Sequence, residues 1–316
     1  MMGRYLLRRA GLIVLTLILS SLVIFTITQL LPGDIARVML GQFATEEAIA
    51  NLTEELGLNR PIYVQYFDWL IKFVQGDWGI SQMSRQPVYP LIMQRLKNSG
   101  FLAGLATLIY VPIGVILGVV AARRKDKVVD QAITTFSMVT VAIPEFVTAL
   151  LLIPLLSHHL EWFPANSSIS PGSTFAEAFP YLILPAIVVS LTSIGYITKM
   201  TRAGTIDVLE SGYVRAAYLK GVPRFQVLTR HVLRNALLPT ITVVAICTAA
   251  LIAGIVVVEM VFGYPGMGRL LVYSIENRDL PLIQAVSMIF VIVLTLANLI
   301  ADILYSLLNP RIRLGK

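Results

Sequence analysis

Two carboxylates in this chain of 316 residues lie inside long apolar runs, where an acidic group is unusual. Glu145 follows Pro144 in one run, and Asp302 follows Asn298 by four residues in another. A carboxylate deep in a bilayer costs ~2.5–3.5 kcal/mol on insertion scales for aspartate, so it faces a bundle interior or a water-filled cavity. Glu145 is therefore a candidate pathway residue that meets a substrate ammonium, or else a structural residue hydrogen-bonded to a neighbouring helix. Asn298 and Asp302 share a helix face, and we predict that they form polar contacts between helices.

Other familiar chemistries are not predicted by the sequence. No G-x-x-x-x-G-K-[ST] loop is present to cradle the phosphates of a nucleotide, and no catalytic cluster is recognisable. His158 and His159 are adjacent, so their rings would point apart on a helix, and no third metal ligand lies near them. The single cysteine, Cys247, excludes a disulfide within the chain. We expect no metal, no cofactor and no enzymatic activity on this chain itself.

The composition is that of an integral membrane protein. Hydrophobic residues make up 56% of the chain and charged residues only 14%, whereas a soluble domain carries about a quarter charged residues. A net charge of +7 could suggest a nucleic-acid partner. The basic residues are instead confined to alternate loops, so no nucleic-acid partner is expected.

Six segments are long and apolar enough to cross a bilayer as helices, which takes about 20 residues. The predicted spans are residues 11–31, 99–121, 132–156, 181–198, 237–258 and 284–308. The first lacks a small-residue cleavage site, so we interpret it as a retained span rather than a signal peptide. Pro144, Pro154 and Pro185 fall within spans and are candidate kinks.

The charges between the spans indicate their orientation. Basic residues exceed acidic ones in residues 1–10, 122–131, 199–236 and 309–316. The intervening segments 32–98, 157–180 and 259–283 have no basic excess. The positive-inside rule therefore places both termini in the cytoplasm of a multi-pass protein.

The segment 199–236 is predicted to contain two short cytoplasmic helices. Ser211 can cap the first, and Gly221 suits the left-handed position just past its end. The small pair Ala216–Ala217 would let the backbone of another protein come close. A second helix, about 223–236, has arginines and apolar side chains that suit the inner membrane surface.

The same segment resembles the cytoplasmic signature of ABC-importer permeases: Glu-Ala-Ala, three residues, Gly, and a later Leu-Pro. Here the pattern is Arg215-Ala216-Ala217, three residues, Gly221, and then Leu238-Pro239. Arginine replaces the glutamate, and Leu-Pro lies further from the glycine. Both departures resemble the dipeptide, oligopeptide and nickel permeases, where Y-x-R-x-A-x-x-K-G and H-x-L-R-N-A-L-L-P are typical.

Six further motifs resemble the first permease subunit of that subgroup, in order along nearly the whole chain. They are LPGD (31–34), LGLNRPIYVQYFDWL (56–70), GDWGIS (76–81), EMVFGYPGMGRLL (259–271), RDLP (278–281) and NPRIR (309–313).

The resemblance implies an all-α membrane protein with six spans and the type I ABC-importer transmembrane fold. Residues 1–98 would hold the first span and a long external loop. Residues 99–308 would form a five-helix permease core with the coupling segment 199–236, and 309–316 a cytoplasmic tail. The residues that the resemblance assigns to coupling with an ATPase are Arg215, Ala216, Ala217, Tyr218 and Gly221.

The resemblance also implies partners in the lipid bilayer of a bacterial inner membrane. They are a second, homologous permease subunit that forms a heterodimer with this chain, two ATP-binding subunits that carry ATP and Mg, and a periplasmic or extracellular substrate-binding protein. Substrate would cross by alternating access, and peptides are the expected substrate, with nickel chelates and glutathione left open.

Alternatives remain at this stage. A self-sufficient secondary carrier or channel subunit would need intramembrane charge pairs or a selectivity ring, and only Glu145 and Asp302 are found.

In the external loop, Thr45 can cap a helix that ends at Gly57, and Pro61 opens an aromatic helix that ends at Gly76. That aromatic helix could lie on the outer membrane surface, pack over the bundle, or help to dock a binding protein.

Overall fold

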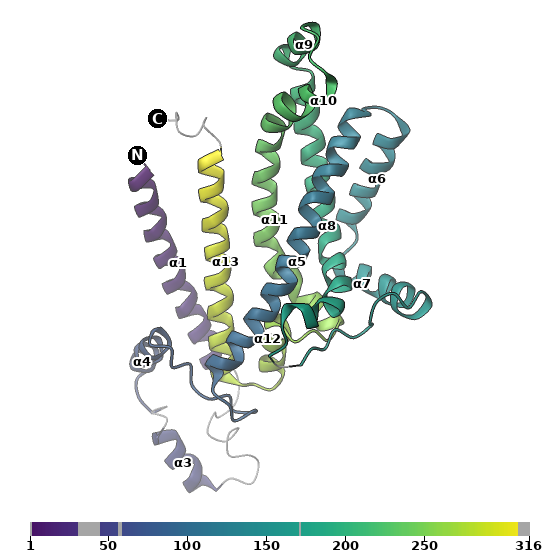
Figure 1. The fold of residues 1–316 in the computed structure, drawn as a ribbon. Helices are drawn as coiled ribbons and strands as arrows, with labels where there is room; N and C mark the ends of the chain where they lie inside the picture. Colours follow the sequence, from purple (N-terminus) through teal and green to yellow (C-terminus); the bar gives the residue numbers. More distant parts are fainter. Residues whose placement is uncertain (1, 31–44, 56–58, 171, 309–316) are drawn as a thin grey trace. The chain divides into compact units, whose positions relative to one another are not determined.

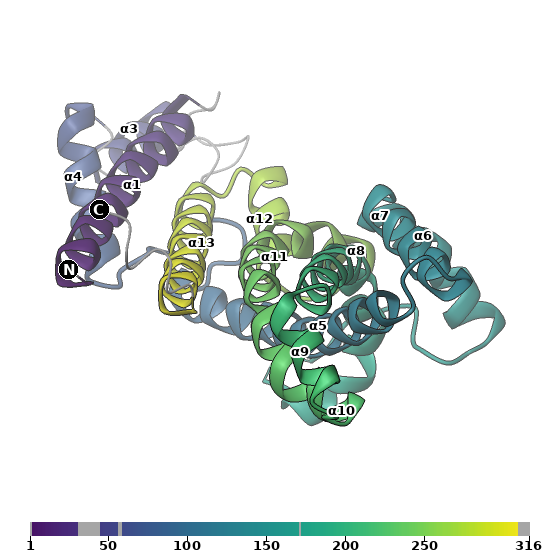
Figure 2. The ribbon, with the colours of Figure 1, turned by 90° about the horizontal axis from the view of Figure 1, so that it is seen from above.

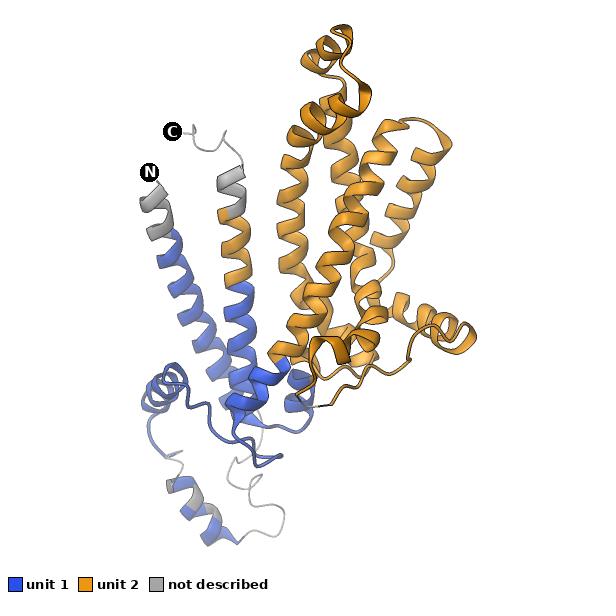
Figure 3. Ribbon diagram, viewed as in Figure 1, with its two compact units in different colours: residues 1–95, 270–295 blue, residues 96–269, 296–316 orange. Residues whose placement is uncertain are grey.

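The computed structural model describes residues 2–30, 45–55, 59–170 and 172–308, and these form helices joined by turns (Figure 1). The motifs LPGD and NPRIR, the tail 309–316 and the predicted helix end at Gly57 lie outside the described residues. The chain divides into two compact units (Figure 3), residues 1–95 with 270–295 and residues 96–269 with 296–316.

Five helices in the described part of the chain are long and apolar enough to span a membrane. They are α1 (Met2–Leu30), α5 (Val88–Arg123), α8 (Phe175–Leu209), α11 (Leu233–Val261) and α13 (Leu280–Leu308). A further pair of helices is long and apolar enough to span a membrane only when taken together: α6 (Val128–Ala142) and α7 (Glu145–Ile153), which continues into the π-helical turn η1 (Pro154–His159). The predicted number of six spans is confirmed when this pair is counted as one.

The span predicted over 132–156 is sharply bent at the candidate kink Pro144, where α6 and the α7–η1 segment meet at an angle of 105°. Pro144 cannot donate a backbone hydrogen bond, and its ring pushes the preceding residue out of the helical region. Ile143 accordingly is extended, with φ −85° and ψ 123°. Of the other two candidate prolines, Pro154 begins η1, and Pro185 lies inside the continuous helix α8.

The first unit contains the two loop helices. The backbone N–H of Ala48 donates to Thr45 Oγ1 at 3.2 Å, which confirms Thr45 as the cap of α3 (Glu46–Glu55). The aromatic helix α4 (Ile62–Val74) is followed by Gly76 in the left-handed region. The Tyr66 hydroxyl of α4 lies 2.8 Å from Ser21 Oγ of α1, so α4 packs against the first span.

Two of the sequence motifs meet within this unit. Asp279 of RDLP is fully buried and precedes α13. Its carboxylate accepts hydrogen bonds from Ser81 Oγ of GDWGIS at 2.5 Å and from the Leu282 backbone N–H in the first turn of α13 at 3.4 Å. The aspartate therefore caps a helix and ties the external loop to it.

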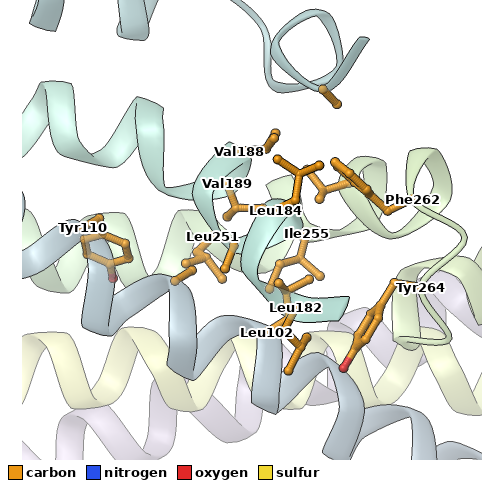
Figure 4. Close-up of a cluster of buried hydrophobic side chains, with 14 of the residues drawn as sticks. Leu102, Tyr110, Leu182, Leu184, Val188, Val189, Leu251, Ile255, Phe262 and Tyr264 are labelled. Atoms are coloured by element: carbon orange, nitrogen blue, oxygen red, sulfur yellow. The ribbon is translucent and has the colours of Figure 1, made fainter. Parts of the chain in front are cut away.

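The second unit is built around α8, which lies between α6 and α11 in both views (Figures 1 and 2). Its core is a cluster of buried apolar side chains from α5, α8 and α11 (Figure 4). Close helix crossings depend on glycine: a Cβ at Gly195 would stand 2.6 Å from the Ser137 carbonyl oxygen of α6. A Cβ at Gly204 would stand 2.6 Å from the Ala236 carbonyl oxygen of α11. Small residues let membrane helices approach closely, and α8 is thereby held on two sides.

Candidate coupling site

The predicted short helix is α9 (Gly212–Leu219), at the same end of the second unit as the α5–α6 loop (Figure 1). Ser211 occupies the cap position but makes no capping hydrogen bond, because its hydroxyl donates back to the Val208 carbonyl. Gly221 has φ +76°, as predicted. The Gly221 N–H donates to the Tyr218 carbonyl at 3.0 Å and the Val222 N–H to the Ala217 carbonyl at 3.2 Å. These two bonds form a Schellman motif, which fixes where α9 ends.

The inner face of α9 packs on its own chain. Val214 is fully buried in a small cluster with Val227, Val232 and Ala236, and Ala217 packs half-buried against the same cluster. Since Ala217 faces inward, it is not an open contact for another protein in this structure.

The outer face of α9 is exposed. Leu219 is 84% exposed and Tyr218 is 41% exposed, although both are apolar or aromatic. Arg215 and Ala216 are also exposed, and so is Gly221 beyond the helix end. Four of the five predicted coupling residues are therefore accessible: Arg215, Ala216, Tyr218 and Gly221. We call these four residues together with Leu219 the α9 surface.

The predicted second helix is not a separate surface helix. Pro223 is the N-cap of α10 (Arg224–Gln226), so the helix begins one residue after its predicted start at about residue 223. The helix continues through the π-helical turn η2 (Val227–Val232) into α11, so that residues Arg224–Val261 form one span of 38 residues. No glycine or proline lies between Pro223 and Pro239 to end it.

Hydrogen bonds join α9 to α11, and α11 in turn to α8. Thr201 of α8 and Thr240 of α11 share a hydrogen bond of 3.0 Å between buried hydroxyls. Tyr213 of α9 accepts a hydrogen bond from Asn235 Nδ2 at 2.9 Å. A displacement of α9 therefore acts on the ends of both α8 and α11.

An ion pair joins α8 to α6 near the same end. The Arg202 guanidinium donates to both carboxylate oxygens of Asp130, at 2.6 and 2.7 Å. Asp130 is buried, and it also accepts from the Asp126 N–H at 2.9 Å. Nearby, Lys125 Nζ lies 2.6 Å from Glu210 Oε1, and this hydrogen bond raises the pKa of the exposed Lys125 ammonium. In the sequence these residues stand out only as loop charges, so neither pair is predicted.

Glu145 is the first residue of α7, directly after the bend. Its side chain is half-buried against α11, because a Cβ at Gly254 would stand 2.5 Å from Glu145 Oε2. Within the described part of the chain it makes no ion pair and no hydrogen bond, so the predicted structural bond to a neighbouring helix is not observed. Asn298 and Asp302 lie on α13, one helical turn apart; Asn298 is exposed and Asp302 is half-buried.

A third acidic residue, Glu259, was predicted to lie in a loop but is fully buried near the end of α11. Its carboxylate accepts from Ser99 Oγ at 2.5 Å and from the Gly268 N–H at 2.7 Å, at the start of α12 (Met267–Glu276). The Met267 N–H donates to Ser99 Oγ at 2.8 Å. The motif EMVFGYPGMGRLL is therefore a tight turn in which a carboxylate caps the helix that follows.

Comparison with known proteins agrees with this architecture. Residues 114–314 match the family model of the binding-protein-dependent transport system inner membrane component, and residues 2–100 match the model of its N-terminal part. A crystal structure of an amino acid ABC transporter with histidines has the same fold at a TM-score of 0.51 and 17% identity, over 69% of this chain and 94% of that one.

Curated relatives match over the full length. A probable peptide ABC transporter permease protein of Sinorhizobium fredii is 39% identical over 99% of this chain and 100% of its own. The oligopeptide permease protein AppB of Bacillus subtilis is 38% identical over 98% of this chain and 99% of its own. The glutathione permease protein GsiC of Escherichia coli K12 is 35% identical over 99% of both chains. The chain is a transporter subunit rather than an enzyme, and it belongs to the family of inner membrane components of binding-protein-dependent transport systems.

Proposed function

We propose that this chain is one of two homologous permease subunits of an ATP-driven peptide importer in a bacterial inner membrane. Relatives whose names include peptide, oligopeptide and glutathione transport support the choice of substrate. In this proposal two ATP-binding subunits carry ATP and Mg in the cytoplasm, and a substrate-binding protein delivers peptide from the other side. This chain itself binds no cofactor.

The observation that carries the proposal is the α9 surface. A helix of eight residues is too short to be stable alone in water, yet α9 is fixed by a Schellman motif and by the buried Val214. Its other face presents Leu219, Tyr218 and Arg215 to solvent. A rigid, exposed and partly apolar helix can bind in a groove on an ATP-binding subunit, because such grooves bind helices through apolar anchor residues.

Closure of the ATP-binding subunits would then move α9. Because α9 is hydrogen-bonded to Asn235 of α11, and α11 is hydrogen-bonded to α8 between Thr240 and Thr201, both helices would move with it. The α9 surface is therefore the point at which hydrolysis is coupled to alternating access.

The test is Ala216→Trp in the complete importer reconstituted in proteoliposomes. Ala216 is exposed, so the indole should leave the permease fold intact while it obstructs docking. We expect ATP-driven peptide uptake to fall by about tenfold or more, which corresponds to about 1.4 kcal/mol of lost docking free energy. Stimulation of ATP hydrolysis by the loaded binding protein should fall in parallel.

The matched control compares Arg215→Ala with Arg124→Ala. Both arginines are exposed at the same end of the second unit, but Arg124 lies in the α5–α6 loop. Only the change at Arg215 should weaken binding of the ATP-binding subunits. Ala217→Trp is a poor probe, because Ala217 packs against the Val214 cluster. Normal uptake and normal ATP hydrolysis in Ala216→Trp would show that α9 is not the coupling helix.

A further inference from the structure

The carboxylate of Glu145 lies where the sixth span is interrupted. It is the first residue of α7, after the bend of 105°, and the backbone before it is extended at Ile143. A broken span exposes polar backbone within the membrane, and such backbone occurs only where it is buried in protein or lines a water-filled cavity. The position of Glu145 thus points to a polar environment at membrane depth.

The neighbouring helix is shaped to receive this carboxylate. Gly254 of α11 has no side chain, and a Cβ there would stand 2.5 Å from Oε2 and 2.8 Å from Oε1 of Glu145. Any other residue at this position would therefore displace both carboxylate oxygens. The contact places the charge between α7 and α11, two helices of the same unit.

No positive side chain of the described residues pairs with this charge. Three ion pairs among the described residues join Arg60 to Asp68, Lys125 to Glu210 and Arg202 to Asp130, and none of them involves Glu145. The N-terminus of α7 offers a partial positive charge of roughly +0.5. This charge favours the carboxylate anion but leaves its two oxygens able to accept hydrogen bonds. Ionisable groups within spans normally pair with one another or mark substrate pathways. No such pair is observed for Glu145 among the described residues, which leaves the substrate pathway.

We infer that Glu145 binds the α-ammonium group of a peptide during its passage, with Gly254 as the residue that positions the carboxylate. This inference rests on the proposed function. An ammonium is a compact cation with three donors, and two carboxylate oxygens in a partly desolvated site match it in charge and in hydrogen bonding.

The experiment uses the complete importer in proteoliposomes, with the binding protein saturated either by a labelled tripeptide or by its N-acetylated form. In Glu145→Gln, uptake of the free tripeptide should fall about tenfold, a loss of about 1.4 kcal/mol, while uptake of the acetylated form stays unchanged. Gly254→Ala should shift the ratio of the two rates in the same direction, and Glu145→Asp should retain part of the preference. Thr148→Val, a change on the same face of α7 that leaves the carboxylate in place, is the matched control and should keep the wild-type ratio.

Two results would overturn the inference: an equal fall for both peptides in Glu145→Gln, which would indicate a structural role, or wild-type rates for both. ATP hydrolysis stimulated by the binding protein, measured in parallel, should stay at the wild-type level in Glu145→Gln, and its loss would also indicate a structural role. Failure of the proposed function is a separate result, since it would appear as absence of peptide uptake by the wild-type importer.

Discussion

Removal of the Asp130 carboxylate tests whether α6 and α8 are held together at their ends. Asp130→Ala deletes two charge-assisted hydrogen bonds, at 2.6 and 2.7 Å, and leaves the Arg202 guanidinium without its partner. Breaking a fully buried pair costs about 3–5 kcal/mol. The Arg202 side chain is 28% exposed, so water can partly replace the carboxylate, and we expect a loss of about 2–3 kcal/mol in the free energy of unfolding.

The assay is reversible unfolding of the purified chain in mixed micelles, run as a double-mutant cycle with Arg202→Ala. Because the two side chains contact each other, the effects of the single changes should not add, and the interaction energy should be about 1–2 kcal/mol. Lys125→Ala, which breaks the exposed pair with Glu210, should have a smaller effect than Asp130→Ala. A loss below about 0.5 kcal/mol for Asp130→Ala would mean that the pair behaves as an ordinary surface salt bridge, and the reasoning would be refuted.

Three further changes probe the turns that position the helices. Gly221→Ala should lower the free energy of unfolding by about 1–2 kcal/mol because of its positive φ, whereas Gly221→Asn should cost less; thermal unfolding of both variants decides this. Glu259→Ala leaves the start of α12 uncapped and should cost about 3 kcal/mol, clearly more than Ser99→Ala. Ser81→Ala should cost about 1–2 kcal/mol, since the buried carboxylate of Asp279 loses a donor, and proteolysis of the external loop should become faster; an unchanged rate would contradict the role given to this bond.

Local features of the fold could be predicted from the sequence. The spans follow from the length of apolar runs, the cap at Thr45 from its position before Glu46 and Glu47, and the left-handed turn at Gly221 from the end of a short helix. Each of these depends on residues that are close in the chain. A kink at Pro144 could also be predicted. The angle between α6 and α7 could not, because it depends on how these helices pack on α8 and α11.

Features that depend on distant residues could not be predicted. Asp130 and Arg202 are separated by 72 positions, and nothing in the local charge pattern selects that pair over others. The orientation of Ala217 was also not predictable, because a helix of eight residues has too few turns for its apolar face to be assigned from sequence. Glu259 was assigned to a loop since the last residues of α11 were placed outside the span.

The hydroxyl bond between Thr201 and Thr240 and the close approach at Gly204 have a consequence for where solute can pass. Separation of α8 from α11 at this end would break buried contacts and expose hydroxyl groups to an apolar surrounding. The two helices should therefore tilt as a pair, and a solute would move along the outside of that pair rather than between its members.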